Sequence, residues 1–259
     1  MDWLTQTDAY TALVLALFGL AGGIGITAVG PGGVLPTIGM FLFAGLSPAG
    51  VAGTAIATHV ATGLVGTTAY IRSGQLRDPG TRRTAMLLAA TALVGTPVGV
   101  LLNHAVDGRG FGILLALAVA ATAVLVWMRE RRAGADDAAS THVGTARAAA
   151  LGLAVSAAAG LFGLGGPMLS VPLLVVCGVP VLSALAAAQA QSVVIASVGT
   201  VGYVLTDAVD WPLVLIVGVP ELAGVLIGWK IAHAVPARQL KTILVCTLLL
   251  LAPYLALHS

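Results

Sequence analysis

Charge is what this sequence has least of. Only 8% of its 259 residues are charged, whereas 58% are hydrophobic and the mean hydropathy is +1.02. A soluble domain normally carries about 25% charged residues. A soluble surface cannot be built from so few charges, so the composition predicts an integral, multi-pass protein of the cell membrane.

Other absences narrow the function. The net charge is only +2 and there is no basic stripe with interleaved aromatic residues, which argues against a nucleic-acid partner. The two cysteines, Cys177 and Cys246, lie inside apolar runs and form no metal-ligand pattern, so we expect membrane-buried thiols, no metal and no cofactor. No hydrolase elbow, zinc-protease motif or phosphate loop is present, which predicts that the protein is not an enzyme.

What the sequence does contain is a duplicated unit. The cluster Gly30-Pro31-Gly32-Gly33 returns 133 residues later as Gly163-Leu164-Gly165-Gly166. Further matches follow at the same offset without a gap: Gly19 and Gly152, Gly45 and Gly178, Tyr70 and Tyr203, Pro79 and Pro212, Gly95 and Gly228. Two repeats in a very apolar chain are typical of a transporter.

We expect an all-α membrane protein with two repeats, residues 1–132 and 146–259, joined by a linker at 133–145. Each repeat has about five apolar segments. The expected segments are Tyr10–Thr27, Val34–Leu46, Pro48–Ile71, Thr84–Asn103 and Phe111–Met128, then Ala146–Phe162, Met168–Val179, Val181–Leu205, Pro212–Ala234 and Leu240–Leu257. The second segment of each repeat, at roughly 20 Å, is too short for a core of roughly 30 Å. The glycine cluster therefore joins a full helix to a short one.

Arginine and lysine are concentrated in three loops. These loops, residues 72–83, 129–147 and 230–241, should be cytoplasmic by the positive-inside rule. The acidic N-terminus and the loop at 206–210 should be outside. Loops 72–83 and 206–210 occupy equivalent places in the two repeats but fall on opposite sides, which predicts an inverted topology.

The glycine clusters are candidate anion sites. Broken backbone at membrane depth must be buried in protein or line a wet cavity. The N–H groups that start the next helix attract anions, because the helix dipole is positive there. We therefore assign the clusters to substrate binding, through Gly30, Gly32, Gly33, Gly163, Gly165 and Gly166. The alternative is that these glycines only allow close helix packing.

Polar residues stand at equivalent positions in the third segment of each repeat. Thr58 corresponds to Gln191 and His59 to Ser192, and we assign all four to substrate binding because they can donate hydrogen bonds to an oxyanion. The alternative is that Thr and Ser hydroxyls bond to helix carbonyls.

Two ionisable residues, His59 and Glu221, lie deep in apolar runs, where such groups are functional candidates. We assign them to proton coupling. Glu221 has a second interpretation as a buried partner of His59, and each residue has a third as a hydrogen-bonded structural group. The repeat equivalent of Glu221 is Leu88, so the acid has no counterpart in the first repeat.

The duplicated pattern resembles the TauE/SafE sulfite-exporter-like family, also called TSUP. In each copy a full helix ends at a Gly-x-Gly-Gly cluster, and a short helix with a proline (Pro36, Pro172) and a Thr/Ser-bearing helix follow. The run 162–173 is the closest match, and the resemblance covers nearly the whole chain. It implies transport of sulfite, sulfonates and related organosulfur anions across the cytoplasmic membrane, often outward.

We therefore expect a secondary transporter that exports small sulfur-containing anions, such as sulfite or organosulfonates, by alternating access between the two repeats. Its partners are the small anion and the lipid bilayer, and the sequence is compatible with a homo-oligomer. One alternative is an anion channel on the same scaffold, whose flux would not saturate. The other is a non-transporting membrane protein or enzyme subunit, in which both glycine clusters would tolerate bulky replacements.

Overall fold

The computed structural model describes residues 9–132, 143–234 and 239, and this part of the chain is helical and contains no strand. The helices are α1 (Ala9–Ala28), α2 (Val34–Phe43), α3 (Pro48–Arg72), α4 (Pro79–Asn103), α5 (Gly108–Arg132), α6 (Thr145–Phe162), α7 (Pro167–Val176), α8 (Val181–Val204) and α9 (Trp211–Ala234). Two short 3-10 helices, η2 (Pro31–Gly33) and η3 (Gln75–Arg77), precede α2 and α4.

The expected segments match these helices to within a few residues. Seven helices of the described part are long and apolar enough to cross a membrane, and α2 and α7 are shorter, as predicted. The prediction of an all-α integral membrane protein is confirmed. The tenth segment, Leu240–Leu257, and most of the linker lie outside the described residues. Cys177, just after α7, is exposed on the surface of the bundle, and Cys246 lies outside the described residues.

Local sequence explains where two long helices of the first repeat, α3 and α4, begin. Both α3 and α4 carry a proline at the first helical position, where the missing N–H costs no hydrogen bond. The residue before each proline caps the helix: Ser47 Oγ accepts from the Gly50 amide at 3.2 Å, and Asp78 Oδ2 accepts from the Thr81 amide at 2.7 Å. Capping sets the start of each helix within one residue.

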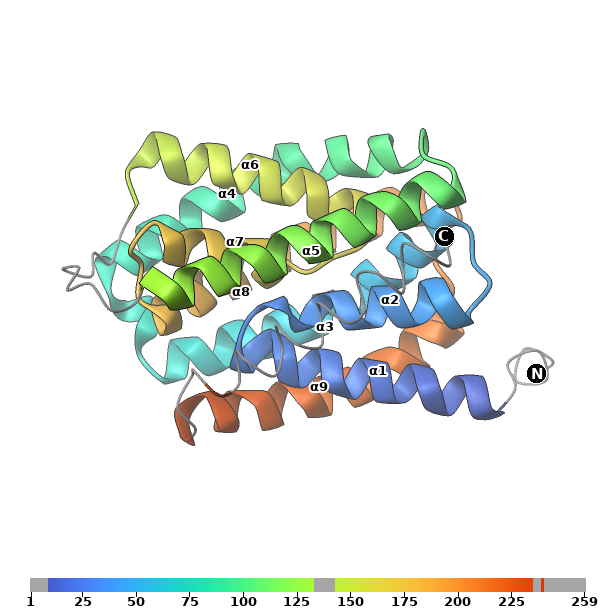
Figure 1. Ribbon diagram of the computed structural model, residues 1–259, viewed down its shortest axis with the longest axis horizontal. Helices are drawn as coiled ribbons and strands as arrows, with labels where there is room; N and C mark the ends of the chain where they lie inside the picture. Colours follow the sequence, from blue (N-terminus) through green and yellow to red (C-terminus); the bar gives the residue numbers. More distant parts are fainter. Residues whose placement is uncertain (1–8, 133–142, 235–238, 240–259) are drawn as a thin grey trace.

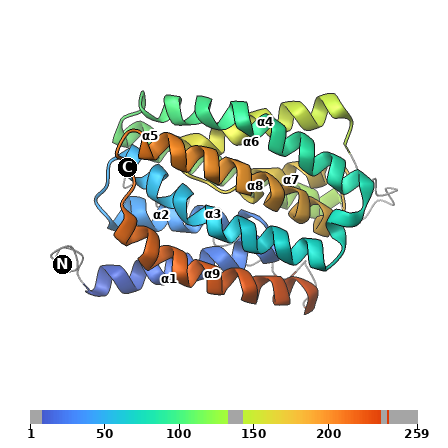
Figure 2. The same cartoon turned by 180° about the vertical axis from the view of Figure 1, so that it is seen from behind.

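The helices form one elongated bundle (Figures 1 and 2). The most extensive helix contacts are α1 with α9 and α4 with α6, and α3 packs along α8 between these two pairs. At the repeat offset α1 corresponds to α6 and α9 to α4, so the two outer pairs are equivalent. Each pair takes one helix from each repeat, and the two repeats therefore share a single core.

Glycine makes both outer pairs possible. A Cβ atom added to Gly23 of α1 would overlap the carbonyl of Glu221 in α9, and one added to Gly99 of α4 would overlap the carbonyl of Ala157 in α6. Small residues allow this approach of backbones, and van der Waals packing then stabilises helix pairs in lipid. For these glycines, which lie outside the two clusters, close packing is sufficient explanation.

The duplication of the sequence is also a duplication of contacts. The Tyr70 hydroxyl donates to the carbonyl of Thr27 at 2.8 Å, and its repeat equivalent Tyr203 donates to the carbonyl of Gly160 at 2.7 Å. The two donors are 133 residues apart in the sequence, and so are the two acceptors. Each tyrosine fixes the third helix of its repeat to the end of the first helix, next to the glycine cluster.

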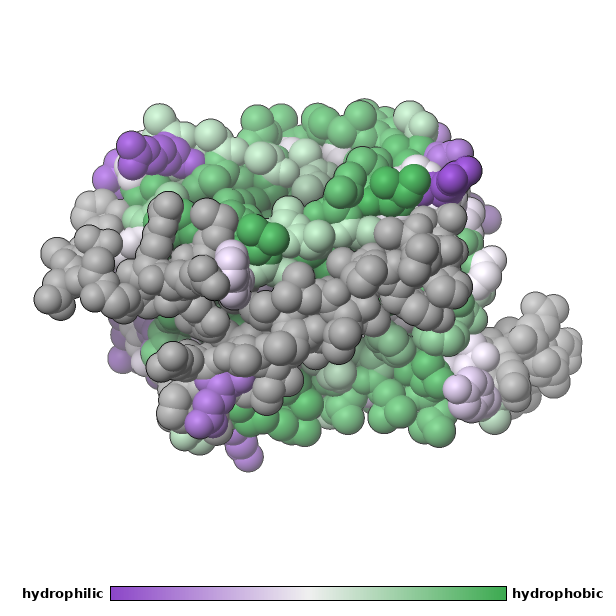
Figure 3. Space-filling view, in the orientation of Figure 1, coloured by the Kyte–Doolittle hydropathy of each residue, from purple (hydrophilic) through white to green (hydrophobic). Residues whose placement is uncertain are grey.

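The two repeats begin at opposite ends of the bundle. In Figure 1, α1 starts at the right-hand end and α6 at the left-hand end. Arg83, near the start of α4, donates to Thr145 Oγ1 at 2.6 Å, which brings the beginnings of α4 and α6 together. Hydrophilic residues gather at the two ends of the described surface, with a hydrophobic band between them (Figure 3). Large exposed hydrophobic side chains, such as Leu101 at 71% exposed, suit contact with lipid.

Candidate functional site

The two glycine clusters meet inside the bundle. Gly30, at the end of α1, has a φ of 109°, which other residues rarely adopt. A Cβ atom at Gly30 would lie 2.8 Å from the Cβ of Val171 and 3.1 Å from the carbonyl oxygen of Pro167, the first residue of α7. Its repeat equivalent Gly163 has a φ of 71° and lies against the backbone of Ala52 in α3. The beginnings of α2 and α7 are therefore buried side by side.

The six glycines assigned to substrate binding differ in what they contact. Gly32 lies against the backbone of Gly25, and a Cβ at Gly166 would lie 2.9 Å from the carbonyl oxygen of Ala188, so both allow helices to approach closely. Gly33 and Gly165 instead border polar side chains. A Cβ at Gly33 would lie 3.6 Å from His59 Nε2.

A Cβ at Gly165 would lie 3.4 Å from His59 Cδ2 and 3.2 Å from Ser192 Oγ. The imidazole of His59 thus occupies the space between the two turns. The sequence prediction that His59 and Ser192 lie beside the glycine clusters agrees with this geometry. Gly33 and Gly165 are the glycines whose added Cβ would point at these side chains, and Gly166 contacts Ser192 through its amide.

The ring nitrogens of His59 make three polar contacts, of which the longest joins Nδ1 to Thr58 Oγ1 at 3.5 Å. The Nε2 atom is 3.2 Å from the carbonyl oxygen of Gly33, and Nδ1 is 2.9 Å from Glu221 Oε1. The side chains of His59 and Glu221 are completely buried. The distance places the groups in ion-pair contact, but neither Glu221 oxygen forms a hydrogen bond of good geometry with any described residue. The structure therefore pairs the two ionisable residues that the sequence singles out.

Ser192 occupies the place of His59 in the second repeat. The amide of Gly166 donates to Ser192 Oγ at 3.3 Å. Thr58 behaves differently, because its hydroxyl donates to the carbonyl of Ala55 in its own helix at 2.9 Å. The hydroxyl has a single proton, so in this conformation Thr58 does not offer a donor to an anion.

Gln191 belongs to a hydrogen-bonded network that the sequence analysis missed. Its Nε2 donates to Ser156 Oγ at 3.1 Å, and its Oε1 accepts from Ser170 Oγ. These bonds connect α8 to α6 and α7. Isolated hydroxyls in the apolar helices 145–162 and 167–176 were the available signal. Gln191 therefore holds the start of α7 in place beside the turns.

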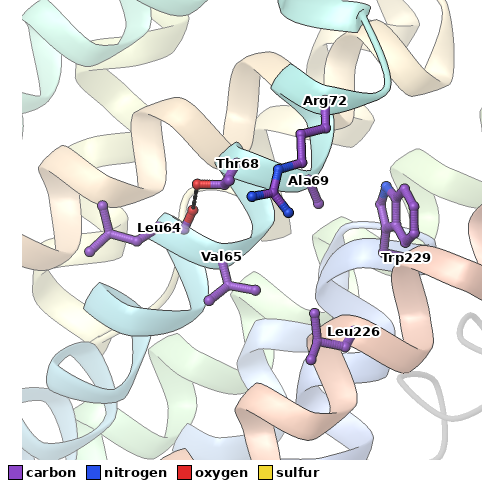
Figure 4. A pocket seen from close by; sticks show the side chains of 7 residues that line it. All are labelled: Leu64, Val65, Thr68, Ala69, Arg72, Leu226 and Trp229. Atoms are coloured by element: carbon purple, nitrogen blue, oxygen red, sulfur yellow. Dashed lines mark hydrogen bonds between the residues drawn. The ribbon is translucent and has the colours of Figure 1, made fainter.

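A separate groove lies on the outer side of the bundle between α3 and α9 (Figure 4). Its volume is about 380 Å³, and its lining is apolar except for Thr68 and Arg72. The Thr68 hydroxyl donates to the carbonyl of Leu64 at 2.8 Å. The groove thus presents one cation and no convergent donors, whereas the turns bring several donors together. We therefore place the candidate site at the turns.

No cluster of three or more His, Cys, Asp or Glu side chains that could hold a metal occurs in the described part of the chain. The site instead combines two helix beginnings, an imidazole with a buried carboxyl partner and a hydroxyl. Helix beginnings attract anions, and an imidazole N–H and a hydroxyl donate hydrogen bonds. The arrangement suits a small oxyanion that is held without a metal.

A bundle of membrane-spanning helices with two buried, glycine-broken turns meeting at a polar centre is the architecture of a membrane transporter. The comparison with protein families agrees. The family description "Sulfite exporter TauE/SafE" matches residues 15–255, and the chain belongs to this family.

The chain is also 24% identical, over 241 residues, to the "Probable membrane transporter protein YdhB" of Bacillus subtilis (strain 168). The match covers 91% of this chain and 94% of that protein. No solved structure matches the chain significantly. The family and the relative together identify a multi-pass membrane transporter of the TauE/SafE type.

Proposed function

We propose that the protein exports small sulfur-containing anions, such as sulfite or organosulfonates, across the cell membrane, and that it is a transporter rather than an enzyme. The observation that carries this proposal is the meeting of the two helix beginnings around His59 and Ser192. The opposite starting ends of α1 and α6 support inverted repeats, in which substrate sites lie at the repeat interface.

The substrate contacts come from both repeats. The oxygens of the anion lie against Gly33 and Gly165 and accept a hydrogen bond from Ser192. His59 borders the same space with the Cδ2 edge of its ring, because Gly33 and Glu221 engage its two nitrogens. The remaining cluster glycines, Gly30, Gly32, Gly163 and Gly166, shape the turns. Thr58 and Gln191 stand beside the site with their own hydrogen bonds in place. Replacing water by these fixed donors is how a small anion can enter an apolar bundle.

Alternating access follows from the two equivalent outer pairs. The α1–α9 and α4–α6 pairs are each closed by glycine contacts, so each moves most readily as a rigid unit. We propose that these pairs rock against the central α3–α8 pair and open the site to one side at a time. Because such a bundle opens to only one side at a time, its flux saturates as the anion concentration rises. The flux through a channel would not.

We also propose that the end of the bundle with Arg72, Arg82 and Arg83 faces the cytoplasm. In a chain without Cys177 and Cys246, a cysteine at Asp210 should react with an impermeant maleimide from outside, and one at Gln75 should not. Labelling of Gln75→Cys from outside would contradict the orientation.

The function is tested on purified full-length protein in proteoliposomes. Saturable uptake of at least one of sulfite, thiosulfate, sulfate, taurine or sulfoacetate is expected, and the same anion should raise the thermal unfolding midpoint. Ser192→Ala should weaken binding by roughly ten- to a hundredfold, because a hydrogen bond to a charged group contributes about 1.5–3 kcal/mol. Thr68→Ala, in the outer groove, is the matched control and should bind normally. Flux that does not saturate would favour a channel, and no flux of any of these anions would refute the proposal.

A further inference from the structure

The hydrogen bond of His59 to the glycine turn fixes the location of a proton. The carbonyl of Gly33 can only accept, so His59 Nε2, at 3.2 Å, must carry a hydrogen. The other nitrogen, Nδ1, faces Glu221 Oε1 at 2.9 Å. Two lone pairs at that distance would repel, so one of these two facing atoms carries a proton. It belongs either to an imidazolium beside a carboxylate or to a carboxylic acid beside a neutral imidazole, and in both cases the pair has no net charge.

No neighbouring group can compensate a change in this charge. The described helices that pack around the pair, α1, α2, α7 and α8, contain no Asp, Glu, Lys, Arg or His, and neither does η2. On α3 and α9 themselves, Arg72, Lys230 and His233 lie about 20 Å, about 13 Å and about 18 Å further along the helix. The phenols of Tyr70 and Tyr203 donate to backbone carbonyls. A proton gained or lost by the pair therefore changes the charge of the whole site.

The pair is also next to the proposed anion site. The imidazole lies between Gly33 and Gly165, within 4 Å of the Cβ position of each. In a buried site an opposite charge nearby favours the charged form of a group, and a like charge disfavours it. An anion at the turns therefore favours a pair that has gained a second proton and disfavours a pair that has lost its only one.

We propose that the His59–Glu221 pair takes up a second proton together with the anion, so that the protein carries one proton with each monovalent anion in the same direction. This inference rests on the proposed anion transport. The proton adds to the Glu221 carboxylate or to His59 Nδ1. Either route forms one new O–H or N–H bond, breaks none, and ends with an imidazolium beside a neutral carboxylic acid. The positive charge gained balances the negative charge of the anion, so the loaded site is neutral.

Movement of protons against the anion is disfavoured by the same geometry. An exchanger would have to bind the anion when the pair has released its proton, which puts two negative charges in one buried site. The coupling is reciprocal, since a proton that tightens anion binding is itself held more tightly when the anion is bound. Anion affinity should therefore fall as pH rises.

The test uses methanesulfonate, a monovalent sulfonate whose charge does not change over the range from about pH 5 to pH 8 in which histidine pairs titrate. Calorimetry in two buffers of different protonation enthalpy should show proton uptake on binding to the wild-type protein. In proteoliposomes an inward proton gradient should accelerate methanesulfonate uptake several-fold, and a pH dye inside should report protons arriving with the anion.

Glu221→Gln separates this role from a structural one. The amide has the same shape but cannot gain a proton. Because His59 can still gain one, the single variant should shift the pH dependence of binding, and the double variant Glu221→Gln/His59→Gln should bind the anion independently of pH and without proton uptake. Thr68→Ala should keep the wild-type pH dependence. An infrared difference spectrum of the wild-type protein adds a readout that needs no variant: Glu221 is the only buried acid in the described part of the chain, and the anion should increase the C=O band of a protonated carboxyl group.

The outcomes distinguish the two proposals. Methanesulfonate or thiosulfate flux without proton movement, or with protons moving the opposite way, would overturn the coupling and leave the transport function standing. Unchanged pH dependence in the double variant Glu221→Gln/His59→Gln would also overturn it. If the wild-type protein neither binds nor moves either anion, the proposed function fails and this inference fails with it.

Discussion

The two repeats differ most at the point where each touches its own glycine turn. In the first repeat His59 donates to the carbonyl of Gly33, whereas in the second Ser192 accepts from the amide of Gly166. The position of the partner differs as well. His59 meets Glu221 of α9, and the repeat equivalent of that glutamate is Leu88 of α4, which is just as deeply buried.

This comparison shows that the two repeats share backbone conformation and tyrosine hydrogen bonds but do not share the buried ionisable groups. Positive-φ glycines at Gly45 and Gly178 and tyrosine bonds at Tyr70 and Tyr203 are the same in both repeats. The buried ionisable side chains, His59 and Glu221, have no ionisable counterparts at the equivalent positions, Ser192 and Leu88. A symmetric scaffold suits two alternating conformations of similar energy, and a single asymmetric charge suits one coupling site.

The largest effect is expected where the shared scaffold is broken. In Gly163→Ala a Cβ atom would overlap the backbone of Ala52, and the φ of 71° adds strain, so little folded protein should survive extraction. Gly45→Ala is the matched control, because its φ of 63° carries similar strain but nothing lies within 4 Å of the added atom. Its cost should be about 1–2 kcal/mol. Size-exclusion profiles after detergent extraction measure both, and equal loss in the two variants would show that strain rather than overlap matters.

The next effect concerns the asymmetric pair. His59→Leu removes one partner of a buried pair and should destabilise the protein by about 3–5 kcal/mol, because Glu221 is left without its partner. The double variant His59→Leu/Glu221→Leu makes the site apolar, like Leu88 at the equivalent position of the first repeat, and should recover most of this loss. Thermal unfolding in detergent provides the double-mutant cycle. Additive losses would show that the two side chains do not interact.

Most of the fold could be predicted from the sequence because lipid imposes strong constraints. A run of about 20 apolar residues has few alternatives to a spanning helix, and Gly-Pro-Gly-Gly cannot continue one. The start of α4 was placed five residues late, at Thr84 rather than Pro79, because the basic first turn of that helix resembles a loop. Apolar periodicity carries no information about a charged helix end.

The candidate site could be predicted only in part. Charge in an apolar run identified His59 and Glu221, since burying such groups is costly without a function or a partner. Their contact depends on the packing of α3 against α9, which no local pattern encodes. The roles of Ser156 and Ser170 were missed for the same reason, because a hydroxyl in a membrane helix has a ready partner in its own backbone. Ser156 keeps that partner and also accepts from Gln191, whereas Ser170 donates to Gln191, and only the fold shows these contacts.

A smaller effect should be equal in the two repeats. Tyr70→Phe and Tyr203→Phe each leave a buried carbonyl, of Thr27 or Gly160, without its donor. Each change should cost about 1–3 kcal/mol, and the two costs should agree within about 0.5 kcal/mol. Thermal unfolding of the two variants measures this directly. A large difference would mean that the repeats share a contact but not its energetic role.

The smallest effect is expected at Thr58, the repeat equivalent of Gln191. Its hydroxyl already donates to the Ala55 carbonyl of the same helix, so Thr58→Val should change stability by about 0.5 kcal/mol or less and anion affinity by no more than about twofold. Ser192→Ala also removes a hydroxyl group, but one that borders the glycine turn, and it should weaken anion binding far more. Both are measured by calorimetric titration with the transported anion. A tenfold loss in Thr58→Val would show that its hydroxyl turns away from Ala55 when the substrate is bound, and Thr58 would then join Ser192 as a direct hydrogen-bond donor to the anion.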